Sequence, residues 1–155
     1  MKKIAVFPGS FDPITCGHTS IIERALPLFD KIIISIGINS LKSSFFDLET
    51  RMKMIQEVFK NYEKIEVQSY SGLTIDFCRN QNAQFLLRGL RTSADFEFER
   101  SIGQINKQLD TSIETIFLLT EPQHSAINSS IVRDILRHNG DISQFVPKEI
   151  LSFIK

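Results

Sequence analysis

The sequence of 155 residues has no tryptophan and just two cysteines, Cys16 and Cys78. Two cysteines so far apart lack metal-binding or redox spacing, which is typical of a reduced cytosolic protein. No apolar run approaches the roughly 20 residues that cross a membrane, and the apolar stretch at the N-terminus is too short for a signal peptide. We therefore expect a cytoplasmic protein without disulfides or membrane contact.

Net charge is also missing, because 18 Lys and Arg residues balance 18 Asp and Glu residues. A general nucleic-acid-binding protein is usually basic, so we expect no nucleic-acid partner. A local basic pocket for a small polyanion stays compatible with this balance. The length predicts a single domain over residues 1–155, large enough to bury a core.

Apolar runs and helical stripes alternate along the chain. Strands are expected at Lys3–Phe7, Lys31–Gly37, Lys64–Gln68, Gln84–Leu87 and Glu114–Leu119. Helices are expected at Gly17–Phe29, from Asp47 to about Phe59, and at Thr74–Asn82, Ser93–Leu109, Asn128–His138 and Pro147–Ile154. Continuous apolar runs such as Ile32–Ile34 are typical of strands covered on both faces. The pattern predicts one doubly wound α/β domain with a five-stranded parallel sheet.

Polar residues follow every expected strand. They are Gly9–His18, then Asn39, Ser40 and Lys42, then Ser71, Gly72 and Thr74, then Arg88, Gly89 and Arg91, and finally His124–Ser130. The carboxyl ends of parallel strands share one edge, where ligands of such sheets bind. We expect these five loops to converge there.

The first of these loops has the composition of a phosphate site. A helix N-terminus offers unpaired N–H groups and partial positive charge, and Gly9 and Gly17 let the backbone approach a ligand. His18 at the helix start can donate to the same anion. Taken singly, His18 also fits a solvent-exposed histidine, Lys42 a solvated lysine, and Ser129 a helix cap.

The stretch P-G-S-F-D-P-I-T-C-G-H at Pro8–His18 resembles the (H/T)-x-G-H loop of the nucleotidyltransferase superfamily. More closely, the chain resembles the bacterial phosphopantetheine adenylyltransferases over nearly its whole length. The further matching motifs are the Lys42 loop, R-G-L-R at Arg88–Arg91, D-F-E-F-E at Asp95–Glu99 and I-N-S-S-I-V-R at Ile127–Arg133.

The resemblance implies a Rossmann-like nucleotidyltransferase fold. It implies that ATP and 4′-phosphopantetheine give dephospho-coenzyme A and pyrophosphate, by direct attack on the α-phosphate. It also implies a homohexamer and feedback by coenzyme A. Mg²⁺ would be held mainly by the ATP phosphates, since no side-chain cluster suggests a metal cage.

Residue roles come from the same resemblance. His18 would be catalytic and bind ATP. Further ATP contacts would come from Ser10, Phe11, Gly89, Leu90, Arg91, Glu99, His124, Ser125, Ala126, Ile127, Asn128, Ser129 and Ser130. The acceptor would be bound by Ser10, Lys42, Thr74 and Arg88.

Four residues depart from the family pattern. Ser10 replaces a common Thr, Cys16 an Asn, His124 an aromatic Trp or Tyr, and Asn128 a Ser. Two alternative functions remain open at this point. One is a sister nucleotidyltransferase with another acceptor, such as nicotinamide mononucleotide or glycerol 3-phosphate. The other is a non-catalytic, flavodoxin-like nucleotide-binding module.

Overall fold

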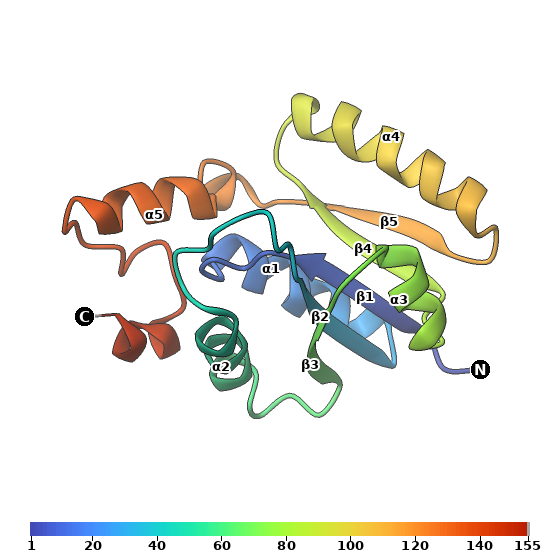
Figure 1. The fold of residues 1–155 in the computed structure, drawn as a ribbon, viewed down its shortest axis with the longest axis horizontal. Coiled ribbons are helices and arrows are strands. Elements are labelled where there is room, and N and C mark those ends of the chain that lie inside the picture. The colour runs from blue at the N-terminus through green and yellow to red at the C-terminus, as the bar shows by residue number, and fades with distance from the viewer. Residues whose placement is uncertain (155) are drawn as a thin grey trace.

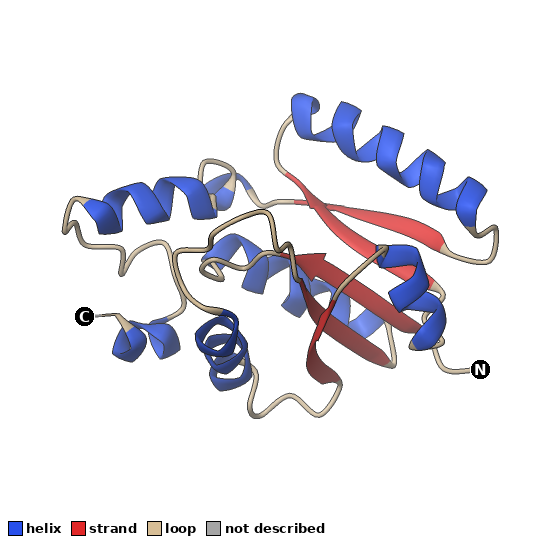
Figure 2. Ribbon diagram, in the orientation of Figure 1, coloured by secondary structure: helices blue, strands red, loops and turns tan. Residues whose placement is uncertain are grey.

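The computed structural model describes residues 1–154, and its centre is a sheet of five strands (Figure 2). The strands are β1 (Ile4–Gly9), β2 (Lys31–Gly37), β3 (Ile65–Tyr70), β4 (Phe85–Leu90) and β5 (Glu114–Leu119). All four pairings are parallel, in the order β3-β2-β1-β4-β5. The predicted parallel α/β fold is confirmed.

Within residues 1–154, five α-helices and three short 3₁₀ helices connect and flank the strands. The α-helices are α1 (Cys16–Ala25), α2 (Leu48–Val58), α3 (Thr74–Asn80), α4 (Ser93–Leu109) and α5 (Ser129–Arg137). The 3₁₀ helices are η1 (Leu26–Leu28), η2 (Pro122–His124) and η3 (Lys148–Phe153). The first predicted helix ends early because Pro27 cannot continue it. The last predicted helix is a 3₁₀ helix after Pro147.

Helices cover both faces of the sheet (Figure 1), and each face has its own core. On one face Ile22 of α1 and Ile55 of α2 pack with Phe7 and Ile34 of the sheet. On the other face Ile75 and Cys78 of α3 pack with Val6, Ile33 and Leu86 of the sheet. Side chains that alternate along β1 therefore enter opposite cores, which explains its continuous apolar run.

The direction in which successive strands are added to the sheet reverses between β1 and β4. From β1 the chain first adds β2 and β3 on one side, and then returns to add β4 and β5 on the other. At such a switch point the loops after two neighbouring strands diverge, and this opens a crevice at their carboxyl ends. The loop after β1 leads into α1, whose first turn contains His18, and the loop after β4 contains Arg91.

The fourth strand is longer than the sequence predicts. It continues through Arg88, Gly89 and Leu90, and these residues pair in register with Phe117, Leu118 and Leu119 of β5. Arg88 is therefore a strand residue, not a loop residue, and strand pairing fixes its backbone.

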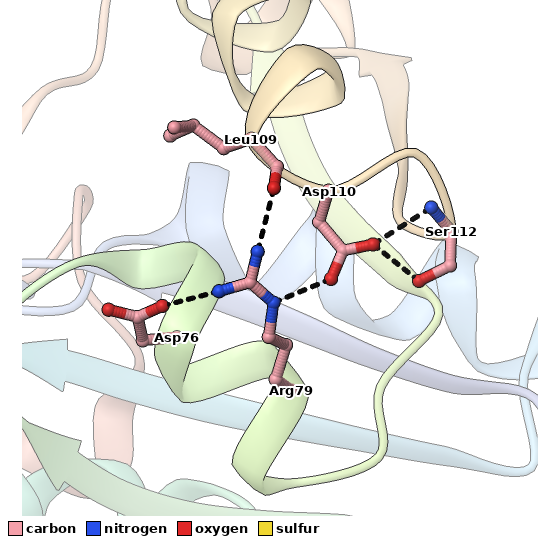
Figure 3. Close-up of polar contacts among 5 residues, drawn as sticks. All are labelled: Asp76, Arg79, Leu109, Asp110 and Ser112. Atoms are coloured by element: carbon pink, nitrogen blue, oxygen red, sulfur yellow. Dashed lines mark hydrogen bonds and ion pairs between the residues drawn. The ribbon is translucent and has the colours of Figure 1, made fainter.

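The C-terminal end of α4 is fastened to α3 by Arg79 (Figure 3). Its guanidinium donates to Asp76 and Asp110, and to the carbonyl oxygen of Leu109, each at 2.7 Å. Hydrogen bonds from Ser112 and Arg79, with a smaller effect of the Arg79 charge, lower the pKa of Asp110 to about 2. The network closes the last turn of α4, whose carbonyls have no partner within the helix.

A membrane-crossing segment would need a long, apolar helix, and none of the helices within residues 1–154 meets both conditions.

Candidate active site

Thr15 and His18 close the first turn of α1. Thr15 is the N-cap, and its hydroxyl accepts the N–H of His18 at 3.4 Å. The ring of His18 turns back, so that its Nδ1 atom accepts the backbone N–H of Thr15 at 3.0 Å. Because that N–H can only donate, Nδ1 carries no proton, and the neutral ring has its proton on Nε2.

The surroundings keep this ring neutral. Burial, with the nearby charges of Arg91 and Arg88, lowers the pKa of His18 to about 4. A cation would lose hydration there and be repelled by two guanidinium groups. At neutral pH His18 therefore offers an Nε2–H donor beside two permanent positive charges.

Phe11 supports His18 from below the loop. Its backbone has a φ of 47°, in the left-handed region that bulky residues rarely adopt. The ring lies edge-on to the His18 ring, with centroids 4.9 Å apart. A Cβ on Gly9 would lie 3.0 Å from Cε2 of Phe11, so glycine is needed for this packing.

Arg88 joins three elements at the crevice. Its Nε and Nη2 donate to the two carboxylate oxygens of Glu99 on α4, at 2.9 and 2.6 Å. Its Nη1 donates to the carbonyl oxygen of Pro8 on β1, at 2.7 Å. A guanidinium has five N–H groups, so Nη1 and Nη2 each retain one for a ligand. Glu99, which sequence analysis assigned to ATP, is in this structure the ion-pair partner of Arg88.

Arg91 lies on the other side of the cleft, near the start of α5. It pairs with Asp95 at 3.4 Å and donates to the carbonyl oxygen of Ile127 at 3.3 Å. Asn128 is the N-cap of α5, and its side chain accepts the N–H of Ile131 at 2.8 Å. Asn128, which replaces a Ser of the family pattern, therefore caps this helix.

Three adjoining hollows contain most of the predicted site residues, and Ser10 lines all three. The first, the histidine cleft, is lined by Ser10, Phe11, His18, Arg88, Gly89, Arg91, Glu99, Ile127, Asn128, Ser129 and Ser130, among others. The second, the Thr74 hollow, shares Ser10, Arg88 and Glu99 with it and adds Thr74 and Tyr70. The third, the Lys42 hollow, contains Lys42, Arg137 and Arg133.

Four predicted ATP residues do not line the histidine cleft. Leu90 is a buried core residue, 7% exposed. His124, Ser125 and Ala126 lie in and just after η2, and His124 packs beside Gly17, whose Cβ would lie 3.9 Å from that of His124. The Nδ1 atom of His124 is buried without a hydrogen-bond partner among the described residues.

Some residues of the site were missed by sequence analysis. Thr15 holds the catalytic candidate, and its position before the helix is an N-cap signal that could have revealed it. Arg133 lines both the histidine cleft and the Lys42 hollow, and it donates to Ser130 Oγ at 3.0 Å. Its spacing of three residues from Ser130 places the two on one helix face.

Comparison with known proteins agrees with the family resemblance that the sequence motifs indicate. The family model described as cytidylyltransferase-like matches residues 6–135. Phosphopantetheine adenylyltransferase of Flavobacterium psychrophilum is 55% identical over 97% of this chain and 98% of its own length. Its counterpart in Christiangramia forsetii is 54% identical over 95% of this chain and 96% of its own length.

The chain belongs to the phosphopantetheine adenylyltransferase family. Within this family, the Bacteroides thetaiotaomicron member is 51% identical over 96% of the chain and 97% of its own length. Solved structures extend the likeness of the fold beyond the family. A Vibrio parahaemolyticus protein assigned as a nicotinate-nucleotide adenylyltransferase superposes with a TM-score of 0.73 at 21% identity, covering 99% of both chains. At that identity the likeness establishes the Rossmann-like fold alone.

Acidic side chains in the cleft are already paired. Glu99 is held by Arg88, and Asp95 by Arg91. Among residues 1–154, no three His, Cys, Asp or Glu side chains gather as a metal-binding group. This donor set suits an Mg²⁺ ion that arrives with its own phosphate ligands.

Proposed function

We propose that this protein transfers the adenylyl group of ATP to 4′-phosphopantetheine, giving dephospho-coenzyme A and pyrophosphate. The observation that carries the proposal is the neutral Nε2–H of His18 beside Arg88 and Arg91, at the switch point of the sheet. Family membership at above 50% identity supports the choice of acceptor.

The reaction needs charge stabilisation more than acid–base chemistry. A phosphate oxygen of the acceptor attacks the α-phosphorus, and the bond from that phosphorus to the bridging oxygen breaks as pyrophosphate leaves. A phosphate dianion is already a nucleophile, so no base has to remove a proton. His18 donates Nε2–H to an α-phosphate oxygen as that oxygen gains charge, and it keeps its proton.

The acceptor phosphate is assigned to Lys42, Arg88 and Ser10. Arg88 has two unused N–H groups directed by its bonds to Glu99 and Pro8, and Lys42 supplies a second charge from the neighbouring hollow. Thr74, whose hydroxyl lies 2.8 Å from that of Tyr70, borders the hollow where the rest of the acceptor would extend.

The nucleotide is assigned to the histidine cleft and its α5 edge. Gly89 and Arg91 follow one wall, and Asn128, Ser129 and Ser130 form the N-terminus of α5, which favours anions. Leu90 and His124–Ala126 do not line the cleft, so their assigned ATP contacts require either their backbone atoms or a movement of these residues when ATP binds. Mg²⁺ would enter with ATP and neutralise part of the triphosphate charge.

The decisive experiment measures pyrophosphate release with ATP and Mg²⁺. Phosphopantetheine should support turnover, while nicotinamide mononucleotide and glycerol 3-phosphate should not. Loss of a preorganised donor costs about 100-fold or more in kcat, so we expect at least that loss for His18→Ala and little change in substrate KM. His138→Ala, which removes an exposed histidine, is the matched control. Turnover with another acceptor, or near-full activity of His18→Ala, would overturn the proposal.

Assembly, regulation and location are further parts of the proposal. The exposed apolar side chains of α4 support self-association, which we propose gives a homohexamer. The proposed product supports feedback by coenzyme A, which contains the same pantetheine and adenylate groups. Use of ATP and two free cysteines support a cytoplasmic location.

A further inference from the structure

Asp12 is a buried carboxylate for which the proposed chemistry has no use. It lies in the loop between β1 and α1, two residues after Ser10, and it is 5% exposed. Its Oδ2 accepts the backbone N–H of Phe45 and its Oδ1 that of Phe46, both at 2.8 Å. Both carboxylate oxygens therefore accept hydrogen bonds from another segment of the chain.

That segment is the loop that presents Lys42. The loop leaves β2 at Ile38, whose N–H donates to the carbonyl oxygen of Tyr70 at 2.8 Å. It is next held at Phe45 and Phe46 by Asp12. Between these anchors the chain is exposed, and Lys42 makes a local turn with Asn39. Asp12 thus holds the anchor three residues from Lys42.

A second side chain reinforces the connection between the two loops. Arg51 of α2 donates to the carbonyl oxygen of Phe46 at 3.0 Å and to that of Ser10 at 2.9 Å. On the opposite side, Arg133 of α5 donates to the carbonyl oxygen of Asp12 itself at 2.8 Å. The Lys42 loop is therefore tied to the backbone from which His18 and Ser10 extend.

A carboxylate is the side chain that such a tie requires. It accepts at both oxygens, whereas an amide offers one acceptor and a donor group that would oppose an N–H. Hydrogen bonds from backbone N–H groups to an ionised oxygen are also stronger than neutral ones. An Asp12→Asn change keeps the shape but breaks one of the two bonds.

We propose that Asp12 is a positioning residue that fixes Lys42 relative to the His18 loop, and so sets where the acceptor phosphate lies against the α-phosphate of ATP. The inference rests on the proposed function, in which Lys42 binds the acceptor phosphate. Asp12 borders the Lys42 hollow, but both of its carboxylate oxygens are occupied by the backbone N–H groups of Phe45 and Phe46, and it acts through these bonds.

The test compares Asp12→Asn with Asp47→Asn in steady-state kinetics. Asp47 accepts the N–H of Thr50 as the N-cap of α2, close in sequence to the same loop but without a bond to the β1–α1 loop. Losing a hydrogen bond to a charged group is worth roughly tenfold or more. We expect Asp12→Asn to raise the KM for phosphopantetheine by about that factor and the KM for ATP less than about twofold. Asp47→Asn should change neither.

A double-mutant cycle with Lys42→Ala distinguishes a failure of this inference from a failure of the proposed function. If Asp12 acts through Lys42, the double variant has the same phosphopantetheine KM as Lys42→Ala alone. Additive effects, an equal rise of both KM values, or no rise for Asp12→Asn would overturn the inference while leaving the function intact. An unchanged KM in Lys42→Ala would instead refute the assignment of Lys42 and the inference with it.

A second variant covers the case in which Asp12→Asn does not fold. Phe45→Pro deletes one of the two N–H donors and leaves the carboxylate intact. Phe45→Ala loses the same ring but keeps the N–H, so it is the reference. The proline variant should have a roughly tenfold higher KM for phosphopantetheine than the alanine variant, a loss comparable to one charged hydrogen bond. Equal values in the two variants would overturn the inference.

Discussion

A neutral histidine beside two arginines makes this fold sensitive to acid. His18 titrates near its ordinary pKa of 6.5 in the unfolded chain, but its pKa in the fold is about 4. Between those values the unfolded state binds a proton that the folded state does not. Stability is therefore fully present above pH 6.5 and is lost as the pH falls toward 4.

Replacing His18 by glutamine should remove that loss. Glutamine at this helix position can still pair with the Thr15 cap, so the variant should fold. We expect the free energy of unfolding of the natural chain to fall between pH 7 and 4.5 by about 2 kcal/mol more than that of His18→Gln. Urea unfolding at both pH values measures the difference. His138→Gln, at an exposed site, should show the full loss. Equal slopes for His18→Gln and the natural chain would mean that His18 titrates normally in the fold.

The position of His18 could be predicted from the sequence, but its tautomer and its pKa could not. Strand, glycine loop and helix signals follow one another within the first 26 residues. The tautomer depends on the Thr15 N–H, and the pKa on Arg88 and Arg91, which lie about 70 residues away in the sequence. Local patterns contain no information on such distant neighbours.

At the scale of elements, the end of β4 was predicted too early. Apolar periodicity stops at Leu87, because Arg88 is charged and Gly89 has no side chain. The ladder with β5 nevertheless continues to Leu90, since backbone pairing does not depend on the side chains. The charge is tolerated because Glu99 of α4 neutralises it, 2.6 Å away. Strand pairing and the ion pair with Glu99 therefore hold Arg88 at the crevice in one orientation.

Glu99→Gln tests whether that orientation matters. The amide replaces a charged, two-pronged partner with one acceptor, so Arg88 should move more freely. We expect the KM for phosphopantetheine to rise about tenfold, consistent with losing one charged hydrogen bond, with a smaller change for ATP. Glu97→Gln, on the exposed side of the same helix and paired with Arg100, is the control and should change neither. A rise confined to the KM for ATP would instead support direct contact of Glu99 with the nucleotide.

At the scale of the molecule, the sequence predicted convergence of polar loops but not the crevice. Parallel strands must place the loops after them on one edge, which follows from alternation alone. The strand order decides which two loops diverge, and it results from packing in both cores. Within the connection after β5, Thr120 and residues 127–130 line the cleft, whereas residues 124–126 lie in and just after η2 and do not, although they belong to the same motif.

The apolar stripe of α4 predicts how copies of this chain associate. None of the 17 residues of α4 is buried, while Phe98, Ile105 and Leu109 are 68%, 56% and 49% exposed. Their spacing of seven and four residues places them along one side of the helix. An apolar stripe of this length marks an interaction site in most soluble proteins.

A charge on that stripe should dissociate the proposed homohexamer. Ile105→Lys would bury an ammonium group at each subunit contact, at a cost that a single contact does not recover. We expect light scattering to give six chains for the natural protein and a smaller species for Ile105→Lys. Leu28→Lys, at a 51% exposed site in η1, should stay at the natural mass. A monomeric natural protein would refute the hexamer. An unchanged mass for Ile105→Lys would place the contact on another face.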